Sequence, residues 1–390
     1  MPLRLVLGQL RVQEVRHNGL LGHTIVRADG SLHDLADVYL RTCTAGTART
    51  YAYLLVDHLR WLECEVLKPE SVGLRDLERY MGAVGAEVPG PYGQPWRPDK
   101  RPYGQSSLLT AAACLKGFYV FQGRQGINEA LAKALDGTRL PTKADRRRSF
   151  LGHTLQALPS NPLTPTKTVR RRHPKMLPEQ ARPRLVEDLS SARDRMVVTW
   201  LDDGGFRIGE LCGLHLTDLH LREGAPCGDC VSPHVHICHR ERNANRARVK
   251  VKDPWVVESG VVRGGEVRRA SPAMIHSYFE YITGEYPRSA RHGMLLVQLH
   301  GPRRGEPWAT AAARGMLRRA GIRVELGKIL PKEFRHSFTS AVLDASDGNT
   351  MIAREAGGWK SAAMVEEVYG HTDVHDPVLA SALERTWEEQ

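Results

Sequence analysis

The sequence contains no long apolar run. It has no stretch of about 18 or more consecutive apolar residues, the length that crosses a bilayer as a helix, so we expect no membrane-spanning segment. The first residues also lack the basic-then-apolar pattern of a secretory signal peptide. The 7 cysteines are an odd number and are mostly scattered. We therefore expect reduced thiols in a cytoplasmic protein rather than a disulfide framework.

Acidic residues are fewer than basic ones. The 55 Lys and Arg residues outnumber the 44 Asp and Glu residues, which leaves a net charge of +11. This charge, gathered in short basic runs, favours an acidic polymer such as nucleic acid as a partner. The 41% of hydrophobic residues suffices for ordinary globular packing, and 390 residues favour two domains with linkers.

The pattern along the chain changes three times. Residues 1–33 alternate weakly and are interpreted as an N-terminal arm or β-hairpin of unreadable function. Residues 34–135 follow a helical period and predict a helical bundle. Residues 136–175 lose that period and gain proline, threonine and basic residues, which is typical of a linker. Residues 176–390 predict a second domain.

The second domain combines helices with a β-branched region. We predict strands at His234–Cys238 and Trp255–Val257, with a third within Val261–Arg269. A helix broken at Gly204-Gly205 precedes them, and further helices follow. The fold class expected is therefore mainly α with a small antiparallel β-sheet.

Two arginines and one tyrosine suggest a chemistry. Tyr369 is the only tyrosine after Tyr286, so a tyrosine nucleophile in this half has one candidate. Arg207 and Arg335 each stand near the start of a predicted helix. Arginine forks can hold the two non-bridging oxygens of a phosphodiester, and a tyrosine oxygen can form a covalent phosphoryl intermediate.

This constellation resembles the tyrosine recombinase (phage integrase) family. The family pattern is Arg, Lys, His-x-x-Arg, His or Trp, and Tyr. Arg207, in an Arg-Ile-Gly-Glu-Leu run, matches the first arginine, and Arg335 matches the second. Trp359 falls on the His or Trp position and Tyr369 on the nucleophile. The first position of His-x-x-Arg is Lys332, a residue that the related type IB topoisomerases commonly use there.

The resemblance implies a fold and an activity. The fold is a helical, SAM-like core-binding domain at 34–135 and an α+β catalytic domain at 176–390, which together form a DNA clamp. The activity is site-specific recombination through a 3′-phosphotyrosyl intermediate, without a cofactor, by an integrase or transposase of a mobile element. The implied partners are double-stranded recombination sites, a tetramer in the synaptic complex, and accessory DNA-bending or directionality proteins. The implied location is the nucleoid.

The same resemblance assigns the remaining catalytic roles. A lysine on a basic β-hairpin protonates the leaving 5′ oxygen, and an Asn-x-Asn-x-Ala-Arg-x-Lys run selects Lys250, with Lys252 as the alternative. Trp359 would orient the phosphate through its indole N–H, and Lys332 would supply a hydrogen bond or proton.

Basic residues outside the catalytic set are candidate phosphate contacts. They are Arg170, Arg171 and Arg172 of the linker, and Arg240, Arg242, Arg246, Arg248 and Lys252 of the predicted hairpin. A solvated charge run is the alternative interpretation of both segments.

Other functions remain open at this point. They are a Xer-like host resolvase of chromosome or plasmid dimers, a type IB topoisomerase, a non-catalytic DNA-binding protein with a decayed site, and a zinc-dependent nuclease. Cys227 and Cys230 form a Cys-x-x-Cys pair near several histidines, which is a zinc signature. We favour reduced thiols and no metal, because His234, His236 and Cys238 would share one strand face, from which they do not easily close a tetrahedron with the Cys-x-x-Cys loop.

Overall fold

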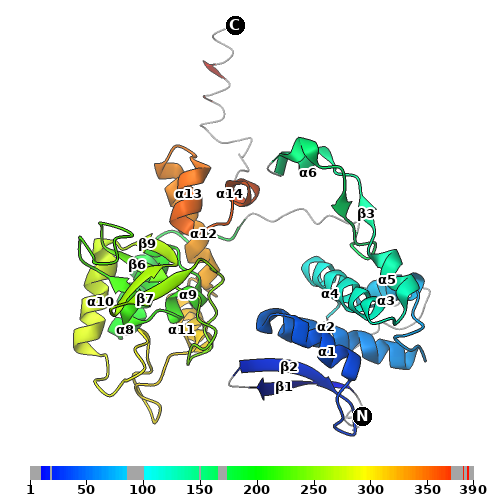
Figure 1. Cartoon of the computed structure of the whole chain (residues 1–390). Helices are drawn as coiled ribbons and strands as arrows, with labels where there is room; N and C mark the ends of the chain where they lie inside the picture. Colours follow the sequence, from blue (N-terminus) through cyan, green and yellow to red (C-terminus); the bar gives the residue numbers. More distant parts are fainter. Residues whose placement is uncertain are drawn as a thin grey trace. The chain divides into compact units, whose positions relative to one another are not determined.

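The chain forms two compact units. The computed structural model describes residues 10–17, 20–85, 101–148, 151–165 and 174–369, with Ser381, Glu384 and Arg385 beyond them. Contacts divide the chain into Met1–Arg171 and Arg172–Gln390, and each unit has its own hydrophobic core (Figure 1). Within the described residues, every helix is too short or too polar to span a bilayer.

The first unit is a helical bundle with a hairpin on one side. The hairpin pairs β1 (Arg11–His17) with β2 (Leu20–Val26), and both strands contact α2. The helices are α1 (Asp34–Thr42), α2 (Ala45–Cys64), α3 (Leu74–Gly85), α4 (Gln105–Arg124) and α5 (Glu129–Leu135). The expected hairpin and helices are therefore present.

Helix α2 shows why this unit folds. Ala52, Leu55, Leu59 and Leu62 recur every three or four residues and are buried, as an amphipathic helix requires. They join Phe118 of α4 in one core.

The stretch after α5 packs on the bundle. It carries β3 (Thr138–Arg139), α6 (Lys143–Arg148), the 3-10 turn η1 (Gly152–Thr154) and β4 (Leu158–Pro159). Asn161 Nδ2 donates to the Ala112 carbonyl of α4 at 2.8 Å, and Lys116 Nζ donates to the Ser160 carbonyl at 2.7 Å. The part of 136–175 up to Leu163 is thus attached to α4. Arg170, Arg171 and Arg172 lie outside the described residues.

The second unit surrounds a small sheet with helices. Helix α8 packs against both α10 and α12. The helices are α7 (Ala181–Asp188), α8 (Ala192–Gly204), α9 (Ile208–Cys212), η2 (Leu216–Asp218), α10 (Pro272–Gly284), α11 (Thr310–Arg323), α12 (Pro331–Ala345), α13 (Thr350–Gly357) and α14 (Ala362–Tyr369). The sequence also predicts a helix at 377–387, with Leu379, Leu383 and Trp387 on one face, but this segment lies outside the described residues, apart from the three noted above.

Five short strands form two antiparallel sheets in this unit. One sheet has the order β5 (Leu219–His220), β6 (His234–Ile237) and β9 (Glu266–Arg269), and the other pairs β7 (Trp255–Glu258) with β8 (Val261–Gly264). The strand expected within 261–269 divides at Gly264 and Gly265, whose φ angles are 75° and 72°. A Cβ at Gly264 would lie 2.4 Å from the Pro254 carbonyl oxygen, so only glycine permits this close approach.

The basic segment 240–252 is a loop. It was expected to form a hairpin, but no described residue between β6 and β7 belongs to a strand. Its asparagines explain the difference: Asn245 Nδ2 donates to the carbonyls of Cys212 and Trp308 at 2.7 and 2.8 Å. These bonds fasten the loop to the end of α9 instead of to a partner strand.

Candidate active site

Two helices of the second unit end in glycine pairs whose carbonyls accept hydrogen bonds from arginines. Gly205 caps the C-terminus of α8 and Gly358 caps that of α13, with φ of 55° and 60°. A left-handed cap suits glycine, and helix ends leave carbonyl oxygens that need donors. The guanidinium groups therefore satisfy the negative ends of two helix dipoles.

Arg335 and Arg268 each join both glycine pairs. Arg335 donates to the Gly205 carbonyl at 2.9 Å and to the Gly358 carbonyl at 3.3 Å. Arg268 of β9 donates to the neighbouring carbonyls of Gly204 and Gly357, both at 3.0 Å. Each arginine is only 4% exposed. A place near the start of a helix predicts an arginine that projects freely into a cleft, but these contacts bury Arg335.

Arg207 reaches the same carbonyl as Arg335. It is the N-cap residue of α9, and its Nη2 donates to the Gly358 oxygen at 3.2 Å. The side chain of Arg207 is 29% exposed, so it forms the solvent-facing side of the pair. The two arginines that the sequence separates by more than a hundred positions thus converge on one oxygen.

Buried charges around these arginines do not cancel. Glu210 forms an ion pair with Arg207 and lies 3.5 Å from Arg268, and Glu266 accepts from Arg268 at 2.7 Å. Burial raises the pKa of Glu210, but the two arginines outweigh it and hold the pKa below its usual value. Three guanidinium groups thus face two carboxylates.

The excess of positive charge affects the pKa of Arg335. Burial, followed by the charges of Arg268 and Arg207, lowers the pKa of Arg335 to about 9. A buried cation whose charged form is disfavoured in this way is stabilised by an anion, because the anion relieves both the repulsion and the desolvation.

Tyr369 ends α14 with its hydroxyl on a histidine. The Tyr369 hydroxyl lies 2.6 Å from Nδ1 of His336, which follows Arg335 on α12. Burial, followed by the charges of Lys332 and Arg335, lowers the pKa of His336 to about 4, so the ring is neutral near pH 7 and can accept the hydroxyl proton. Burial also raises the pKa of Tyr369, against the opposing effects of Thr339 and Arg335.

Trp359 connects the tyrosine with the arginines. The Arg335 guanidinium carbon lies 4.7 Å from the centre of the Trp359 ring, and the Tyr369 ring meets Trp359 edge-on at 5.9 Å. The indole N–H, which the sequence assigned to a phosphate, points to the Thr339 hydroxyl at 3.4 Å. Lys332 is exposed in the first turn of α12, one helical turn before His336.

The loop with the two candidate lysines runs beside α9. A Cβ on Gly209 would lie 2.4 Å from the Arg248 carbonyl oxygen, which places the loop against the helix that Arg207 caps. Lys250 and Lys252 are exposed on this loop. No contact in the described part of the chain joins either lysine to the arginines, so the structure leaves the choice between them open.

One of the basic residues predicted to contact DNA is engaged within the protein. Arg240 grips Asp218, which is fully buried, through two hydrogen bonds of 2.6 and 2.9 Å and stacks on Trp255 at 4.5 Å. Both Nη donors of its fork serve the carboxylate, so we remove Arg240 from the candidate phosphate contacts. Arg242, Arg246, Arg248 and Lys252 are exposed.

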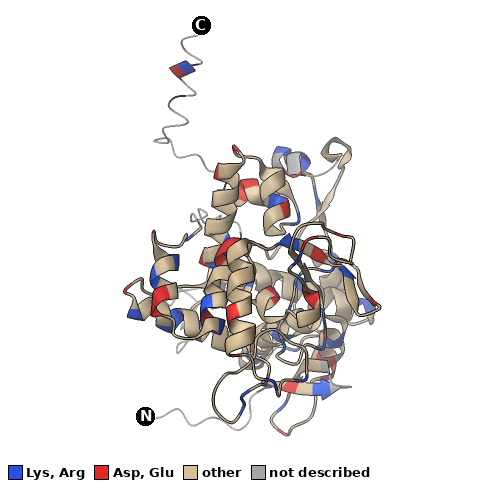
Figure 2. Ribbon diagram, turned by 90° about the vertical axis from the view of Figure 1, so that its left-hand side faces the viewer, with Lys and Arg blue, Asp and Glu red and all other residues tan. Residues whose placement is uncertain are grey.

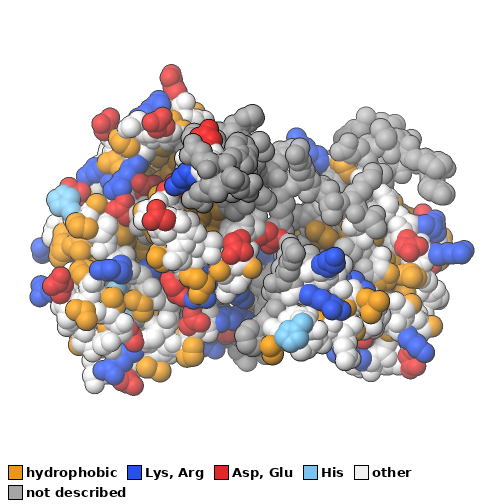
Figure 3. Space-filling view, turned by 90° about the horizontal axis from the view of Figure 1, so that it is seen from above, with side chains coloured by type: hydrophobic (Ala, Val, Ile, Leu, Met, Phe, Trp, Pro, Cys, Tyr) orange, Lys and Arg blue, Asp and Glu red, His pale blue; other side chains and the backbone are white. Residues whose placement is uncertain are grey.

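Charge is mixed over the surface. Figure 2 shows Lys and Arg interspersed with Asp and Glu along helices and loops. Among the described residues on the face drawn in Figure 3, basic, acidic and apolar side chains are all present and intermixed. Local basic segments such as the 240–252 loop, rather than a uniformly basic face, therefore carry any argument about phosphate contacts.

Cys227 and Cys230, the pair considered as a zinc site, lie in different surroundings. Cys227 is buried beside histidines of β5 and β6, whereas Cys230 is only partly buried and is not part of that cluster. The pair Cys227 and Cys230 is therefore not the ligand set.

Sequence reasoning missed several residues of the site. Arg268 and Glu266 look like ordinary residues of a polar strand, and no local pattern marks them. His336 follows the second arginine directly, but the sequence pattern assigns it no role. Its position directly after Arg335 was a usable signal, because consecutive residues at a helix start can border one pocket from two sides.

Comparison with known proteins shows which proteins this chain resembles. No family model matches the chain. A curated relative, Transposase A from transposon Tn554 of Staphylococcus aureus, is 23% identical over 190 residues, which are 49% of this chain and 43% of the relative. The match thus spans less than half the length of that relative.

Three solved structures share the architecture. A XerH site-specific recombinase bound to its difH substrate superposes with a TM-score of 0.55 at 14% identity, covering 88% of this chain and 82% of that one. The Tn1549 transposon integrase with transposon right end DNA gives 0.52 at 15%, covering 90% and 99%. A lambda integrase dimer bound to a core site gives 0.50 at 13%, covering 89% and 99%.

The chain has the fold of the tyrosine recombinases and integrases. The expected fold class, mainly α with small antiparallel sheets, is confirmed by these likenesses.

Proposed function

We propose that this chain breaks and rejoins DNA as a site-specific recombinase of a mobile element, with Tyr369 as the nucleophile. The observation that carries the proposal is the convergence of Arg207 and Arg335 on one carbonyl oxygen, next to the hydrogen-bonded pair of Tyr369 and His336. The proposal assigns the scissile phosphate to this point.

The arginines would lower the barrier electrostatically. Charge develops on the phosphate oxygens as the tyrosine attacks, and preorganised donors in a water-poor site stabilise that charge strongly. The uncancelled positive charge near Arg335 supports an anion at this point. Arg268 would act indirectly. It donates to the Gly204 and Gly357 carbonyls, which neighbour the Gly205 and Gly358 carbonyls that accept from Arg335.

The chemical step needs two proton transfers. The Tyr369 oxygen forms a bond to phosphorus while its proton passes to His336 Nδ1, which is neutral near pH 7. The bond between phosphorus and the 5′ oxygen breaks, and Lys250 protonates that oxygen, with Lys252 as the alternative donor. Attack by a 5′ hydroxyl on the phosphotyrosine reverses the step and reseals a strand.

The choice of a mobile element rests on the sequence match to a transposase. A tetramer on paired double-stranded DNA sites, accessory DNA-bending or directionality proteins and a place in the nucleoid belong to the same proposal. A Xer-like host resolvase uses the same chemistry, and mapping the DNA that flanks the gene distinguishes the two, since element ends and a chromosomal dimer-resolution site differ in position and repeat structure.

The first prediction tests the nucleophile. Tyr369→Phe removes one hydroxyl and little packing, so DNA binding should persist and the covalent adduct should disappear. A nicked duplex made from the DNA flanking the gene, which loses its 5′-hydroxyl fragment on cleavage, traps the adduct on a denaturing gel.

Tyr53→Phe is the matched control for this experiment. Tyr53 lies in the first unit with 57% of its surface exposed, so its variant should form the adduct at the level of the unaltered protein. An adduct that survives in Tyr369→Phe would show that another residue attacks the DNA.

A further inference from the structure

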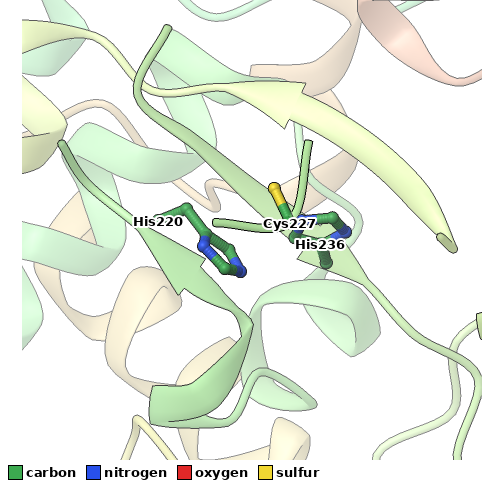
Figure 4. A group of neighbouring side chains, drawn as sticks. All are labelled: His220, Cys227 and His236. Atoms are coloured by element: carbon green, nitrogen blue, oxygen red, sulfur yellow. The ribbon is translucent and has the colours of Figure 1, made fainter. Parts of the chain in front are cut away.

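Three histidines and one cysteine of the second unit form a cluster beside β5 and β6. Strand pairing sets His220 of β5 opposite His234 of β6, and His236 stands on the same face two residues later. The loop 221–233 between these strands folds back and places Cys227 beside them (Figure 4). His234 and His236 are 0% exposed, and Cys227 is 4% exposed.

The donor atoms of His220, Cys227 and His236 lie close together, and His234 contacts two of these residues. The Cys227 sulfur lies 3.2 Å from His234 Nε2, which lies 3.2 Å from His236 Nε2. His220, Cys227 and His236 each place one ligand atom within 4.8 Å of the others. A tetrahedral zinc ion, with bonds of about 2.0–2.1 Å to nitrogen and 2.3 Å to sulfur, sets neighbouring ligand atoms roughly 3.3–3.6 Å apart.

The Nδ1 contacts of His234 and His236 indicate which ring nitrogen carries the proton. His234 Nδ1 lies 2.7 Å from the Ser232 carbonyl, and His236 Nδ1 lies 2.7 Å from the Gly264 carbonyl. A carbonyl oxygen can only accept, so Nδ1 carries the proton in each ring and a neutral ring presents a bare lone pair at Nε2. Two lone pairs at 3.2 Å repel each other unless a cation lies between them.

The third histidine supplies an independent observation. His220 Nε2 is buried and has no hydrogen-bond partner among the described residues. An unpaired buried polar atom costs free energy, and a metal bond would remove that cost. Carbonyl acceptors behind metal-binding histidines, as for His234 and His236, are also what orients such ligands in metal sites.

We propose that His220, Cys227, His234 and His236 bind one zinc ion that fastens the 221–233 loop to the β5–β6–β9 sheet. Imidazole and thiolate donors suit Zn²⁺ better than Mg²⁺ or Ca²⁺, which prefer oxygen ligands. The set is closed by four protein ligands, as in structural zinc sites. In this proposal one donor comes from β5 and only one cysteine of the pair takes part, so the ligands need not share one strand face.

The ion would act away from the proposed chemistry. On β6 the histidines alternate with Val235, which pairs with Arg268 of β9 and points to the opposite face with the core. Metal binding is therefore expected to stabilise the sheet that carries Arg268 without touching a phosphate. The site goes beyond the proposed function, and each can fail without the other.

The test begins with the full chain, purified in chelator-free buffer after its affinity tag is removed. Elemental analysis should find one zinc ion per chain, and a strong chelator should remove it while lowering the melting temperature. Zn²⁺ added alone should restore both. Co²⁺ added to the metal-free protein should give the ligand-field bands of a tetrahedral site and a thiolate-to-cobalt charge-transfer band.

Substitutions then identify the ligands. Cys227→Ser should abolish the thiolate-to-cobalt band, and His220→Asn and His236→Asn should each reduce zinc content. Cys64→Ser and His276→Asn are matched controls, because both residues are exposed and lie outside the cluster, so they should leave zinc content and the cobalt spectrum unchanged.

Two results would overturn the site. The first is a full-length protein without zinc whose melting temperature ignores the chelator and whose Co²⁺ titration gives no thiolate band. The second is a band that persists in Cys227→Ser. The first result uses only the unaltered chain, and a persisting band cannot arise from a variant that fails to fold. Adduct formation by Tyr369, measured separately, tests the recombinase proposal.

Discussion

Lys332 lies one helical turn before His336 and is one cause of the low pKa of that histidine. The family residue expected at this position is a histidine, and here the imidazole stands four residues later with its Nδ1 on the Tyr369 hydroxyl. With lysine at position 332 and histidine at position 336, two residues of α12 can take separate roles. We propose that His336 takes the tyrosine proton, while Lys332 keeps the hydrogen-bonding or proton-donating role at the phosphate and also lowers the pKa of His336.

The second prediction tests this division at Lys332. We assign Lys332 a hydrogen bond or proton to the phosphate, so Lys332→Ala should leave DNA binding nearly unchanged but reduce adduct formation by roughly 10²–10⁴-fold, the usual contribution of a positioned acid. The pKa of His336 should rise above about 4, because a cation that disfavoured the charged ring has been removed, but burial, the largest cause, should keep it below 6.5. Adduct yield on a nicked duplex and the NMR titration of His336 measure the two effects.

Lys328→Ala removes the same charge from an exposed position ahead of α12 and should change neither quantity. Near-normal adduct formation in Lys332→Ala would reduce this lysine to a solvated residue of the helix start.

At the scale of elements, the site depends on how two helices end. The caps of α8 and α13 turn their last carbonyls toward Arg335 and Arg268, so the arginines are positioned by backbone rather than by side-chain partners alone. A Cβ on Gly358 would lie 2.0 Å from Glu266 Oε1 and 2.5 Å from Arg268 Nη2. Glycine at this cap therefore keeps the ion pair of β9 in place.

The third prediction separates this contact from backbone strain. Gly358→Ala should displace the Glu266 and Arg268 side chains, move the shared carbonyl and strongly reduce adduct formation. Gly348→Ala is the matched control, since its φ of 77° imposes a similar strain but nothing lies within 4 Å of the added carbon.

Both variants should lose on the order of 1–3 kcal/mol of unfolding free energy, because alanine is disfavoured at positive φ. Only Gly358→Ala should lose adduct formation. Equal activity of the two variants would mean that the arginine arrangement tolerates movement of this cap.

The fourth prediction concerns helix α2 and pH. His58 is fully buried with Nε2 2.7 Å from the Tyr119 hydroxyl, and burial lowers its pKa from 6.5 to about 3. Below pH 6.5, His58 binds a proton in the unfolded chain but stays neutral in the folded chain. The unfolding free energy therefore falls as the pH falls toward 3. This residue alone should make the unfolding free energy of the first unit about 2 kcal/mol lower at pH 5 than at pH 7.

His58→Gln keeps a polar side chain that does not titrate in this range. Urea denaturation of both proteins at the two pH values should show a smaller pH dependence in the variant, whatever its absolute stability, because the other titrating groups are common to both. An unchanged pH dependence would mean that His58 is not kept neutral by burial.

At the scale of the whole molecule, the basic residues that give the net charge of +11 are interspersed with many acidic residues. The exposed arginines and lysine of the 240–252 loop lie on the segment that packs against α9. The loop therefore lies beside the helix that Arg207 caps. Whether the two units close around DNA as a clamp stays a prediction.

The fifth prediction is a steep salt dependence of DNA binding. Each phosphate neutralised by a protein cation contributes about −0.9 to the slope of log affinity against log salt concentration. Replacing both Arg242 and Arg248 with glutamine should flatten the slope by about 2 and weaken unrelated DNA sequences equally, because phosphate contacts carry no sequence information.

Arg318→Gln, on the exposed side of α11, removes one charge away from the loop and should preserve the slope. A flat salt dependence of the unaltered protein would remove the electrostatic basis of the proposal.

The sequence by itself determined those features that depend on local pattern. The helical period of residues 34–135 and the β-branched segments near 234 and 255 predict elements that the structure contains. Arg207, Arg335, Trp359 and Tyr369 were selected by type and order along the chain, and the structure brings them together. Motifs of this kind are readable because each helix start or end carries its functional residue within a few positions of its own capping signals.

Only the tertiary structure decided which distant side chains share a partner. Arg268 meets Gly204 and Gly357 through contacts between three separate elements, and Asp218 withdraws Arg240 from the surface. His220 joins the Cys227 cluster through the register of β5 on β6. Strand register and helix-end contacts are non-local, so a one-dimensional pattern cannot reveal them: the free energy that selects them comes from burying the whole core and satisfying its polar groups together.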